Sequence, residues 1–166
     1  MKAKDIMSPF NGIALDPEMG LKEAVEFMNF YRKDDGTVGV KGMLVMSGDK
    51  VVGTLSMEDV LRSVIPFYIN PLLSDFTWEG MLLNMASRMC NKKVKEIMNK
   101  NLIFAEPDDS LMECAEKLIK YNLQRLPVVE KGKVVGIILI RDLYNVVINK
   151  ILGRLNGNTD GCGDKY

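Results

Sequence analysis

Apolar residues recur at intervals of three or four positions in two stretches of the chain, a spacing typical of helices with one buried face. These positions are Leu21, Ala24, Val25 and Met28 in the first stretch, and Leu111, Ala115, Leu118 and Ile119 in the second. Ser110 and Glu113 form a capping box at the start of the second stretch. Gly20 takes the corresponding cap position in the first stretch. The spacing therefore predicts two helices that bury one face each.

Each predicted helix is followed by two short apolar runs with a tight turn between them. The runs cover residues 43–46 and 51–55 in the first half of the chain, and residues 126–130 and 133–139 in the second. Their almost continuous Val, Ile and Leu content predicts strands that are buried on both faces. Extended segments at residues 12–15 and 102–105 precede the helices, and further helices are predicted from about Ser56 and from about Ile140. We therefore predict an α/β (α+β) fold in which helices pack against small sheets.

The two halves of the chain are copies of one pattern. KDIM at residues 4–7 returns as KEIM at residues 95–98, and KVVG at residues 50–53 returns unchanged at residues 133–136. Met98 lies 91 residues after Met7, whereas Gly136 lies 83 residues after Gly53. The first copy therefore carries extra residues, which fall in the polar stretch 31–40. One copy is too small to bury a good core, so we expect the two copies to pack together.

This repeat divides the chain into four predicted parts. They are residues 1–65 for the first copy, 66–91 for an inter-repeat segment, 92–154 for the second copy and 155–166 for a tail. Residues 78–89 of the inter-repeat segment alternate between apolar and polar at helical spacing, which predicts an extra helix there. The tail is rich in Gly, Asn and Asp, so we expect it to be disordered.

The charge balance argues against two classes of partner. Among 166 residues, Lys+Arg is 22 and Asp+Glu is 22, so the formal net charge is zero. Such a chain has no overall field to attract nucleic acid or an anionic membrane. A basic group, Lys92, Lys93, Lys95 and Lys100, is interrupted by Glu96 and lacks interleaved aromatic residues. We interpret it as a solvated surface, and we expect no nucleic-acid partner and no membrane partner.

The sequence also lacks the patterns that catalysis requires. Without histidine the usual catalytic triads are excluded, and there is no phosphate-binding loop, nucleophile elbow or cluster of metal ligands. Cys90, Cys114 and Cys162 are too scattered for a metal site or a disulfide framework, which predicts free thiols in a reducing cytoplasm. We therefore expect a cytoplasmic protein that is not an enzyme, with no metal site and no required cofactor.

The two copies resemble the cystathionine-β-synthase (CBS) domain, and the pair resembles the tandem arrangement known as a Bateman module. The similarity is carried by LVMSGDKVVGTLSMEDVL at residues 44–61, by RLPVVEKGKVVGIILIRDL at residues 125–143 and by the KDIM and KEIM segments. It implies two β-α-β-β-α units packed in pseudo-twofold symmetry. It also implies a stand-alone regulatory module that binds AMP, ADP, ATP or S-adenosylmethionine in clefts between the copies. Such modules pair through helical faces, which implies a homodimer.

An adenosine ligand needs an apolar slot for its ring, a carboxylate for the ribose hydroxyls, and cationic or N–H donors for phosphate. In the first copy, Ser56 and Asp59 match the family's Ser/Thr-x-x-Asp segment, which contacts ribose and phosphate. Such a pair is also an ordinary helix start, a serine N-cap followed by an acid, and both interpretations stay open. The slot and the cation expected in the first copy are Gly12, Ile13, Ala14, Met43, Leu44 and Lys41.

The second copy departs from this pattern at one polar position. Leu139 replaces the hydroxyl of Ser56 and cannot cap a helix through its side chain, although Asp142 is kept. An acid kept without its capping partner favours ribose binding, although a role at the positive end of the helix dipole stays open. Arg125 and Arg141 are candidates to hold phosphate, with ordinary surface charge as the alternative. The slot expected in the second copy consists of Leu102, Ile103, Leu126 and Pro127.

A second function stays open beside the nucleotide-binding one. It is a dimeric adaptor or structural protein that binds an effector protein without any nucleotide, and both Leu139 and the apolar stretch at residues 66–73 favour it. The expected homodimer contacts are the second helices, around residues 60–61 and 143–147, with Trp78 and Met81 beside them. Melting-point shifts with adenosine ligands separate the two functions, because a ligand that prefers the native state stabilises it.

Overall fold

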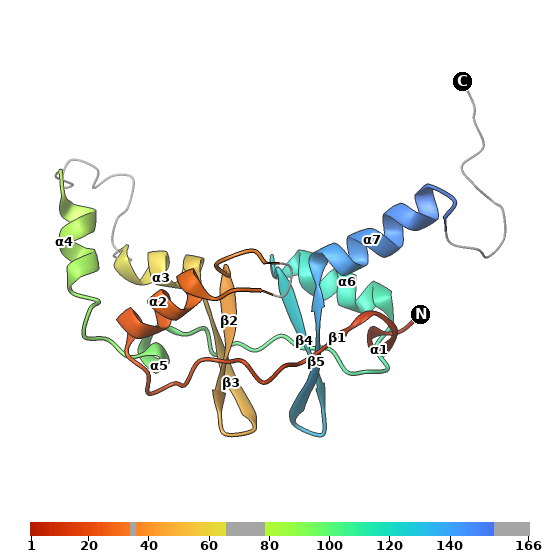
Figure 1. Ribbon diagram of the computed structural model, residues 1–166, viewed down its shortest axis with the longest axis horizontal. Helices are drawn as coiled ribbons and strands as arrows, with labels where there is room; N and C mark the ends of the chain where they lie inside the picture. The colour runs from red at the N-terminus through yellow and green to blue at the C-terminus, as the bar shows by residue number, and fades with distance from the viewer. Residues whose placement is uncertain (34–35, 66–78, 155–166) are drawn as a thin grey trace. The chain divides into compact units, whose positions relative to one another are not determined.

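The computed structural model describes residues 1–33, 36–65 and 79–154, which form two compact units (Figure 1). Unit 1 contains Met1–Asn11 and the chain from Ile103 onward, and unit 2 contains Gly12–Leu102. Both units combine helices with antiparallel strands, which confirms the predicted α+β class. Unit 1 is therefore assembled from two stretches that lie far apart in the sequence.

Unit 2 is built on an antiparallel hairpin of β2 (Gly42–Ser47) and β3 (Lys50–Ser56). Its helices are α2 (Leu21–Phe30), α3 (Met57–Val64), α4 (Met81–Ser87) and α5 (Val94–Ile97). The segment before α2 lies parallel to β2, because the Leu15 N–H donates to the Leu44 carbonyl at 2.9 Å and the Leu15 carbonyl accepts from the Met46 N–H at 2.9 Å. The predicted hairpin and the extended segment beside it are thus both present.

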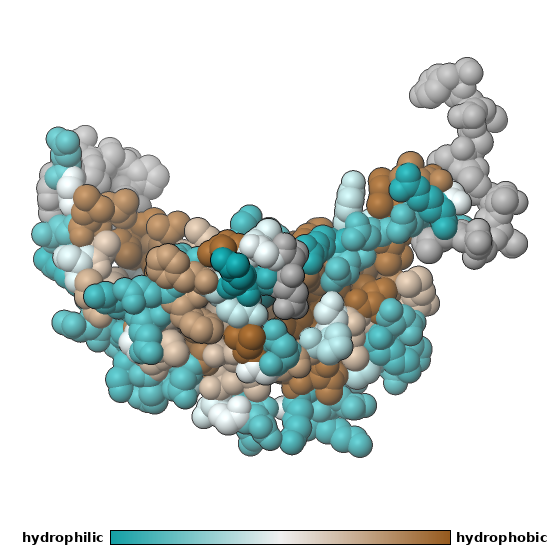
Figure 2. Space-filling model, viewed as in Figure 1, coloured by the Kyte–Doolittle hydropathy of each residue, from teal (hydrophilic) through white to brown (hydrophobic). Residues whose placement is uncertain are grey.

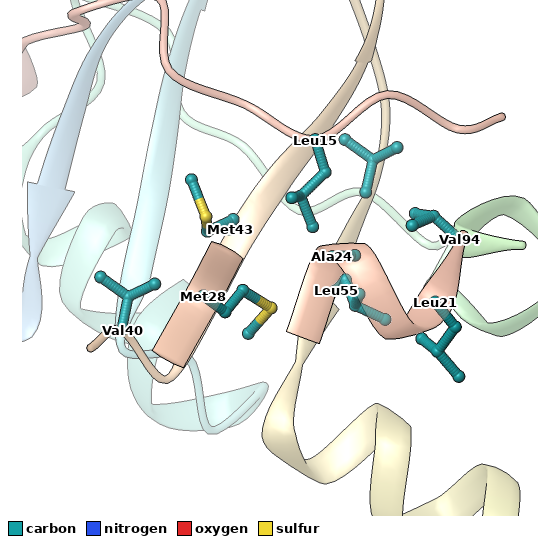
Figure 3. Packing of buried hydrophobic residues seen from close by; sticks show 9 residues of the cluster. Leu15, Leu21, Ala24, Met28, Val40, Met43, Leu55 and Val94 are labelled. Atoms are coloured by element: carbon teal, nitrogen blue, oxygen red, sulfur yellow. The ribbon is translucent and has the colours of Figure 1, made fainter. Parts of the chain in front are cut away.

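The core of unit 2 joins α2, the hairpin and α5. Its buried members are Leu15, Leu21, Ala24, Met28, Val40, Met43, Val45, Leu55 and Val94 (Figure 3). Three of the four residues predicted on the apolar face of α2 belong to this core, and the fourth, Val25, packs against it. Burial of each large side chain contributes about 1.5–3 kcal/mol, so this face anchors α2. The predicted helix and its orientation are confirmed.

Unit 1 contains a three-stranded antiparallel sheet in the order β1-β5-β4. Its strands are β1 (Ser8–Pro9), β4 (Arg125–Glu130) and β5 (Lys133–Leu139), and its helices are α1 (Ala3–Ile6), α6 (Leu111–Lys120) and α7 (Ile140–Ile151). Ala105 lies beside β4 as Leu15 lies beside β2, and its N–H donates to the Pro127 carbonyl at 2.9 Å. The core consists of Ala3, Ala105, Cys114, Leu118, Leu126, Val128, Ile138 and Leu143.

The buried face of α6 differs from the predicted one at its C-terminal end. Ile119 is 71% exposed, so its placement on the apolar face was wrong, and Cys114 is fully buried in its place. Cys114 and Leu118 are four residues apart, which puts them on one line along the helix. Burial raises the pKa of the Cys114 thiol, so the sulfur stays protonated and unreactive.

Two short arms carry the repeated KDIM and KEIM segments. The first arm (residues 1–11) belongs to unit 1, and the second arm (residues 93–102) belongs to unit 2. Each arm thus completes the unit that holds the helices and hairpin of the other sequence copy. A Cβ at Gly136 would stand 2.6 Å from the Met7 Sδ, and one at Gly53 would stand 2.8 Å from the Met98 Sδ. This packing explains why both KVVG segments end in glycine.

The remaining predictions divide into those observed and those that fall outside the described residues. Both hairpins and both second helices begin within one residue of the predicted positions. The helix predicted for residues 78–89 is observed as the shorter α4. The apolar stretch 66–73, Trp78, Cys162 and the tail at residues 155–166 lie outside the described residues, so the predictions made for them stay predictions.

Candidate functional site

The residues expected to form the ring slot lie at the same place in each unit but differ in burial. In unit 2, Ile13 and Ala14 precede the residue that pairs with β2, and Ile13 is exposed. Met43 and Leu44 are adjacent on β2 and both are buried. Met43 belongs to the core below α2, whereas Leu44 does not, as expected for neighbours that point to opposite faces of a strand. Of these two, Leu44 is the better placed to contact a ligand.

Unit 1 repeats this division on β4. Leu126 lies in the core with Ile138, while the adjacent Pro127 is buried but outside that core. Ile103 packs against the core of unit 1. Leu102, in contrast, is the last residue of unit 2 and is half-buried. The expected second slot is therefore assembled within unit 1 except for Leu102.

Ser56 and Asp59 meet at the start of α3 in a complete capping box. The Asp59 Oδ2 accepts hydrogen bonds from the Ser56 backbone N–H at 2.8 Å and from the Ser56 hydroxyl at 2.7 Å. The Asp59 N–H donates to the Ser56 Oγ at 3.1 Å. The helix-start interpretation of this pair is therefore correct, and all three contacts are half-buried. Lys41 reaches the same helix end through its backbone, since the Met57 N–H donates to the Lys41 carbonyl at 2.9 Å.

Asp142 plays the same structural part in unit 1 without a hydroxyl partner. Its Oδ2 accepts the Leu139 backbone N–H at 2.9 Å, at the start of α7. Asp142 thus caps the backbone and does not need the side chain at position 139, so the role at the helix start that the sequence left open is present. The presence of Asp142 beside Leu139 therefore does not by itself indicate a ligand. The Ile140 N–H donates to the Gln124 carbonyl at 3.1 Å, which repeats the contact at Lys41.

One position of the hairpin distinguishes the two sites. Gly42 lies opposite Ser56 on the β2–β3 ladder, and Arg125 lies opposite Leu139 on the β4–β5 ladder. A Cβ at Gly42 would stand 3.2 Å from the Leu55 carbonyl oxygen, closer than side chains usually approach. Unit 2 therefore has no room for a larger residue without a shift of the backbone. Unit 1 accommodates a half-buried arginine at this position, while Arg141 is exposed in the first turn of α7.

Two clusters of ion pairs, which the sequence analysis did not identify, hold the arms. The Glu18 carboxylate accepts from the Lys93 Nζ at 2.7 Å and from the Lys95 Nζ at 2.5 Å in unit 2. Hydrogen bonds from these two lysines lower the pKa of Glu18 to about 2. The available signal was the repeat itself, since an acid follows proline in both copies, at Glu18 and Asp108. These pairs support the interpretation of the basic group as a solvated surface.

The described residues contain neither a cluster of metal ligands nor a helix suited to a membrane. They hold no group of three or more His, Cys, Asp or Glu side chains arranged to bind a metal ion. Among the helices of residues 1–33, 36–65 and 79–154, none combines the length and the apolar character that a membrane crossing requires. Cys90 and Cys114, the two cysteines within the described part of the chain, form no disulfide.

Comparisons with known proteins agree with this fold. The profile of the family described as CBS domain matches residues 3–66 and 94–149. An uncharacterized protein of Methanocaldococcus jannaschii is 25% identical over 164 residues, covering 89% of this chain and 92% of that protein. The crystal structure of CBSX2 from Arabidopsis thaliana in complex with AMP has a TM-score of 0.63 and 22% identity, covering 89% of this chain and 97% of the other.

Several relatives are much longer enzymes. The inosine-5'-monophosphate dehydrogenase of Aquifex aeolicus is 27% identical over 164 residues, which cover 93% of this chain but 28% of the enzyme. The chain therefore spans little more than a quarter of that enzyme, and the similarity is confined to this part. The CBS-pair protein CBSX2 from Arabidopsis thaliana, in contrast, is matched over 97% of its length.

Proposed function

Because the chain belongs to the CBS domain family, we propose that it is a regulatory, non-catalytic module that binds an adenine nucleotide or S-adenosylmethionine. The observation that carries the proposal is one arrangement found in both units. An extended segment lies beside the first strand of a hairpin, and a helix with an acid at its third residue follows the second strand. The N–H groups at these helix ends attract anionic groups. The location of the ligand in clefts between the copies stays a prediction.

The proposed polar contacts start from the two capping acids. In Asp59 and Asp142, the hydrogen bonds that cap the helix use Oδ2. The proposal assigns Oδ1 of each carboxylate to the ribose hydroxyls, so that one oxygen orients the side chain and the other meets the ligand. Ser56, Lys41, Arg125 and Arg141 are the proposed donors to ribose or phosphate. Ile13, Ala14, Leu44, Ile103 and Pro127 are the proposed apolar contacts, with Met43, Leu126, Leu102 and Leu139 behind or beside them.

Calorimetric titration of AMP against Asp59→Asn tests the first site. The substitution keeps the volume of the side chain but removes its charge, and charge-assisted hydrogen bonds contribute about 1.5–3 kcal/mol, so affinity should fall by one to two decades. Glu113→Gln is the matched control, because Glu113 completes an equivalent capping box with Ser110 outside the proposed site. Equal effects of the two substitutions on affinity would show that Asp59 only caps its helix.

A second candidate function, the nucleotide-free dimeric adaptor, is favoured by the apolar surface of α7. Tyr144, Val147 and Ile151 lie three or four residues apart on this helix and are each more than half exposed. In Figure 2, hydrophobic surface lies at the far end of α7 and beside hydrophilic surface along the rest of the helix. Leu61 on α3 is also more than half exposed, whereas Leu143 is buried in the core of unit 1 and is not available as a contact. A homodimer through these helices is therefore part of both candidate functions.

Light scattering tests the dimer. We expect a dimer at micromolar concentration and a monomer for Val147→Lys, since a buried charge in an apolar interface is strongly unfavourable. Val38→Lys is the control, because Val38 is equally exposed but lies in the loop after α2. A monomeric wild-type chain would contradict the homodimer. Melting points measured with AMP, ADP, ATP and S-adenosylmethionine then decide between the two functions, and no shift with any of them would favour the adaptor.

A further inference from the structure

The first arm is held in unit 1 as a docked peptide. Residues 12–102 separate it in sequence from the rest of that unit. Its backbone donates from Ala3 to the Asp109 carbonyl at 2.9 Å and from Lys4 to the Pro107 carbonyl at 3.0 Å. Further along, β1 pairs with β5 at the edge of the sheet. The backbone contacts of the arm therefore extend from the residues just before α6 to β5, the central strand of the sheet.

Side chains of the arm add one residue buried in the core and two ion pairs. Ala3 is fully buried in the core of unit 1. The Lys2 and Lys4 Nζ atoms both donate to the Asp108 Oδ1, at 2.9 and 2.8 Å. Met7 packs onto Gly136 at the far end. Helices and strands this short are not stable alone, so the order of α1 and β1 comes from docking.

The arm is joined to the following chain at an exposed glycine. The chain passes from unit 1 to unit 2 between Asn11 and Gly12, both of which are exposed. Gly12 adopts a φ of +76°, and no atom lies within 4 Å of the position its Cβ would occupy. Glycine adopts positive and negative φ with similar ease, so this residue can turn the arm elsewhere without a steric penalty.

We propose that unit 1 also accepts the first arm from a second copy of this chain, so that two molecules exchange arms and Gly12 is the hinge. The contacts of the arm described above lie between the arm and the rest of unit 1, and each would form unchanged between two chains. The exchange then costs only the association of two molecules and the change at the hinge, which is why swapped elements are a low-cost route to dimers. This proposal does not depend on nucleotide binding or on the surface of α7.

Disulfide trapping between chains tests the exchange. Ser8 and Ile137 are directly opposite each other on the β1–β5 ladder. Ser8→Cys and Ile137→Cys are made in separate full-length chains in which Cys90 and Cys162 are replaced by Ser, and the two chains are mixed at high concentration and oxidised with copper-phenanthroline. We expect a disulfide-linked species with the mass of two chains. Ser8→Cys mixed with Lys131→Cys, at the turn between β4 and β5, is the control for random collision.

A chain carrying both Ser8→Cys and Ile137→Cys shows that the geometry allows the bond. If this chain closes its disulfide internally while the mixture yields no more dimer than the control, the exchange is overturned. Lys2→Cys with Ser110→Cys, which face each other at the antiparallel bridge next to α6, provides a second pair with the same two outcomes.

The hinge gives an independent test. Alanine disfavours the left-handed φ that Gly12 adopts when the arm is docked within its own chain, and release of that strain on exchange should raise the exchanged fraction roughly five- to thirty-fold. Gly48→Ala is the matched control, because Gly48 is also exposed, with a φ of +59° and open space at its Cβ position, but lies in the turn of the β2–β3 hairpin. The exchanged fraction is read from the yield of the interchain disulfide between Ser8→Cys and Ile137→Cys chains that also carry either glycine substitution. Equal yields for Gly12→Ala and Gly48→Ala would overturn the hinge.

Discussion

The two units begin their second helices in different ways, although in each unit an acid at the third residue of the helix caps the backbone. In unit 2 the cap is reciprocal, since Ser56 and Asp59 exchange hydrogen bonds. In unit 1 only the carboxylate takes part, because Leu139 has no side-chain acceptor. Yet α7 has 12 residues and α3 has 8. The comparison shows that the acid-to-backbone contact is sufficient to begin the helix, and that the hydroxyl is the part that can be lost.

A second difference lies across the hairpins. Unit 2 has Gly42 and a hydroxyl at its helix start, whereas unit 1 has Arg125 and a leucine. An arginine holds phosphate through two parallel hydrogen bonds, while a hydroxyl and a carboxylate suit ribose. We therefore expect the site in unit 2 to depend more on ribose and the site in unit 1 to depend more on phosphate.

The largest expected effect concerns a feature that both units share, the packing of an arm against the glycine of a KVVG segment. Gly53→Ala and Gly136→Ala should each destabilise the fold by about 1–3 kcal/mol, because the added Cβ meets Met98 or Met7 and a backbone oxygen of the same arm. Urea denaturation measures the change. Gly20→Ala is a control, since Gly20 has a φ of -64° and nothing lies within 4 Å of the position its Cβ would occupy. A neutral result for both glycines would mean that the arms are not tightly held.

The asymmetry between the sites can be tested at Arg125. Arg125→Ala should weaken AMP binding in unit 1 by about 1–3 kcal/mol and leave adenosine almost unaffected, because only AMP carries the phosphate. Calorimetry with both ligands, together with site occupancy from crystallography, provides the measurement. An equal loss for AMP and adenosine would assign Arg125 to the support of β4 instead of phosphate binding.

The smallest expected effect concerns the ion pairs that hold the two arms, which join Glu18 and Asp108 to two lysines each. Lysines hold the pKa of Glu18 at about 2 and that of Asp108 at about 2, below the ordinary values of 4.5 and 3.8. A carboxyl group with a lowered folded-state pKa stabilises the fold above its ordinary pKa, and this contribution is lost as the pH falls toward 2. The melting point should therefore drop between pH 5 and pH 2.

Variants that lack one of these carboxylates isolate its contribution to the pH dependence of the melting point. Glu18→Gln and Asp108→Asn should each reduce the drop in melting point between pH 5 and pH 2, and the difference from the wild type should shrink in high salt, because both sets of ion pairs are exposed to solvent. A pH dependence identical to that of the wild type in both variants would show that the lysine contacts do not persist in solution.

The sequence by itself determined the elements and their order. The two helices, the two hairpins and the helices after them follow from periodicity, turn residues and the repeat, which are local properties of the chain. The family follows from the same motifs, because they occur twice in one order. Candidate residues such as Ser56 and Asp59 could be named for the same reason, since helix starts are set by neighbours three residues apart.

Only the tertiary structure decided which surfaces meet. Nothing local in the KDIM and KEIM segments shows that each arm completes the unit formed by the other copy, because such pairing depends on what fills a core distant in sequence. For the same reason, the packing of α6 buries Cys114 and leaves Ile119 exposed. It also joined Glu18 to lysines more than seventy residues away. Long-range packing selects among partners that local patterns leave equivalent, and for that reason the sequence predicted the parts while the fold assigned their contacts.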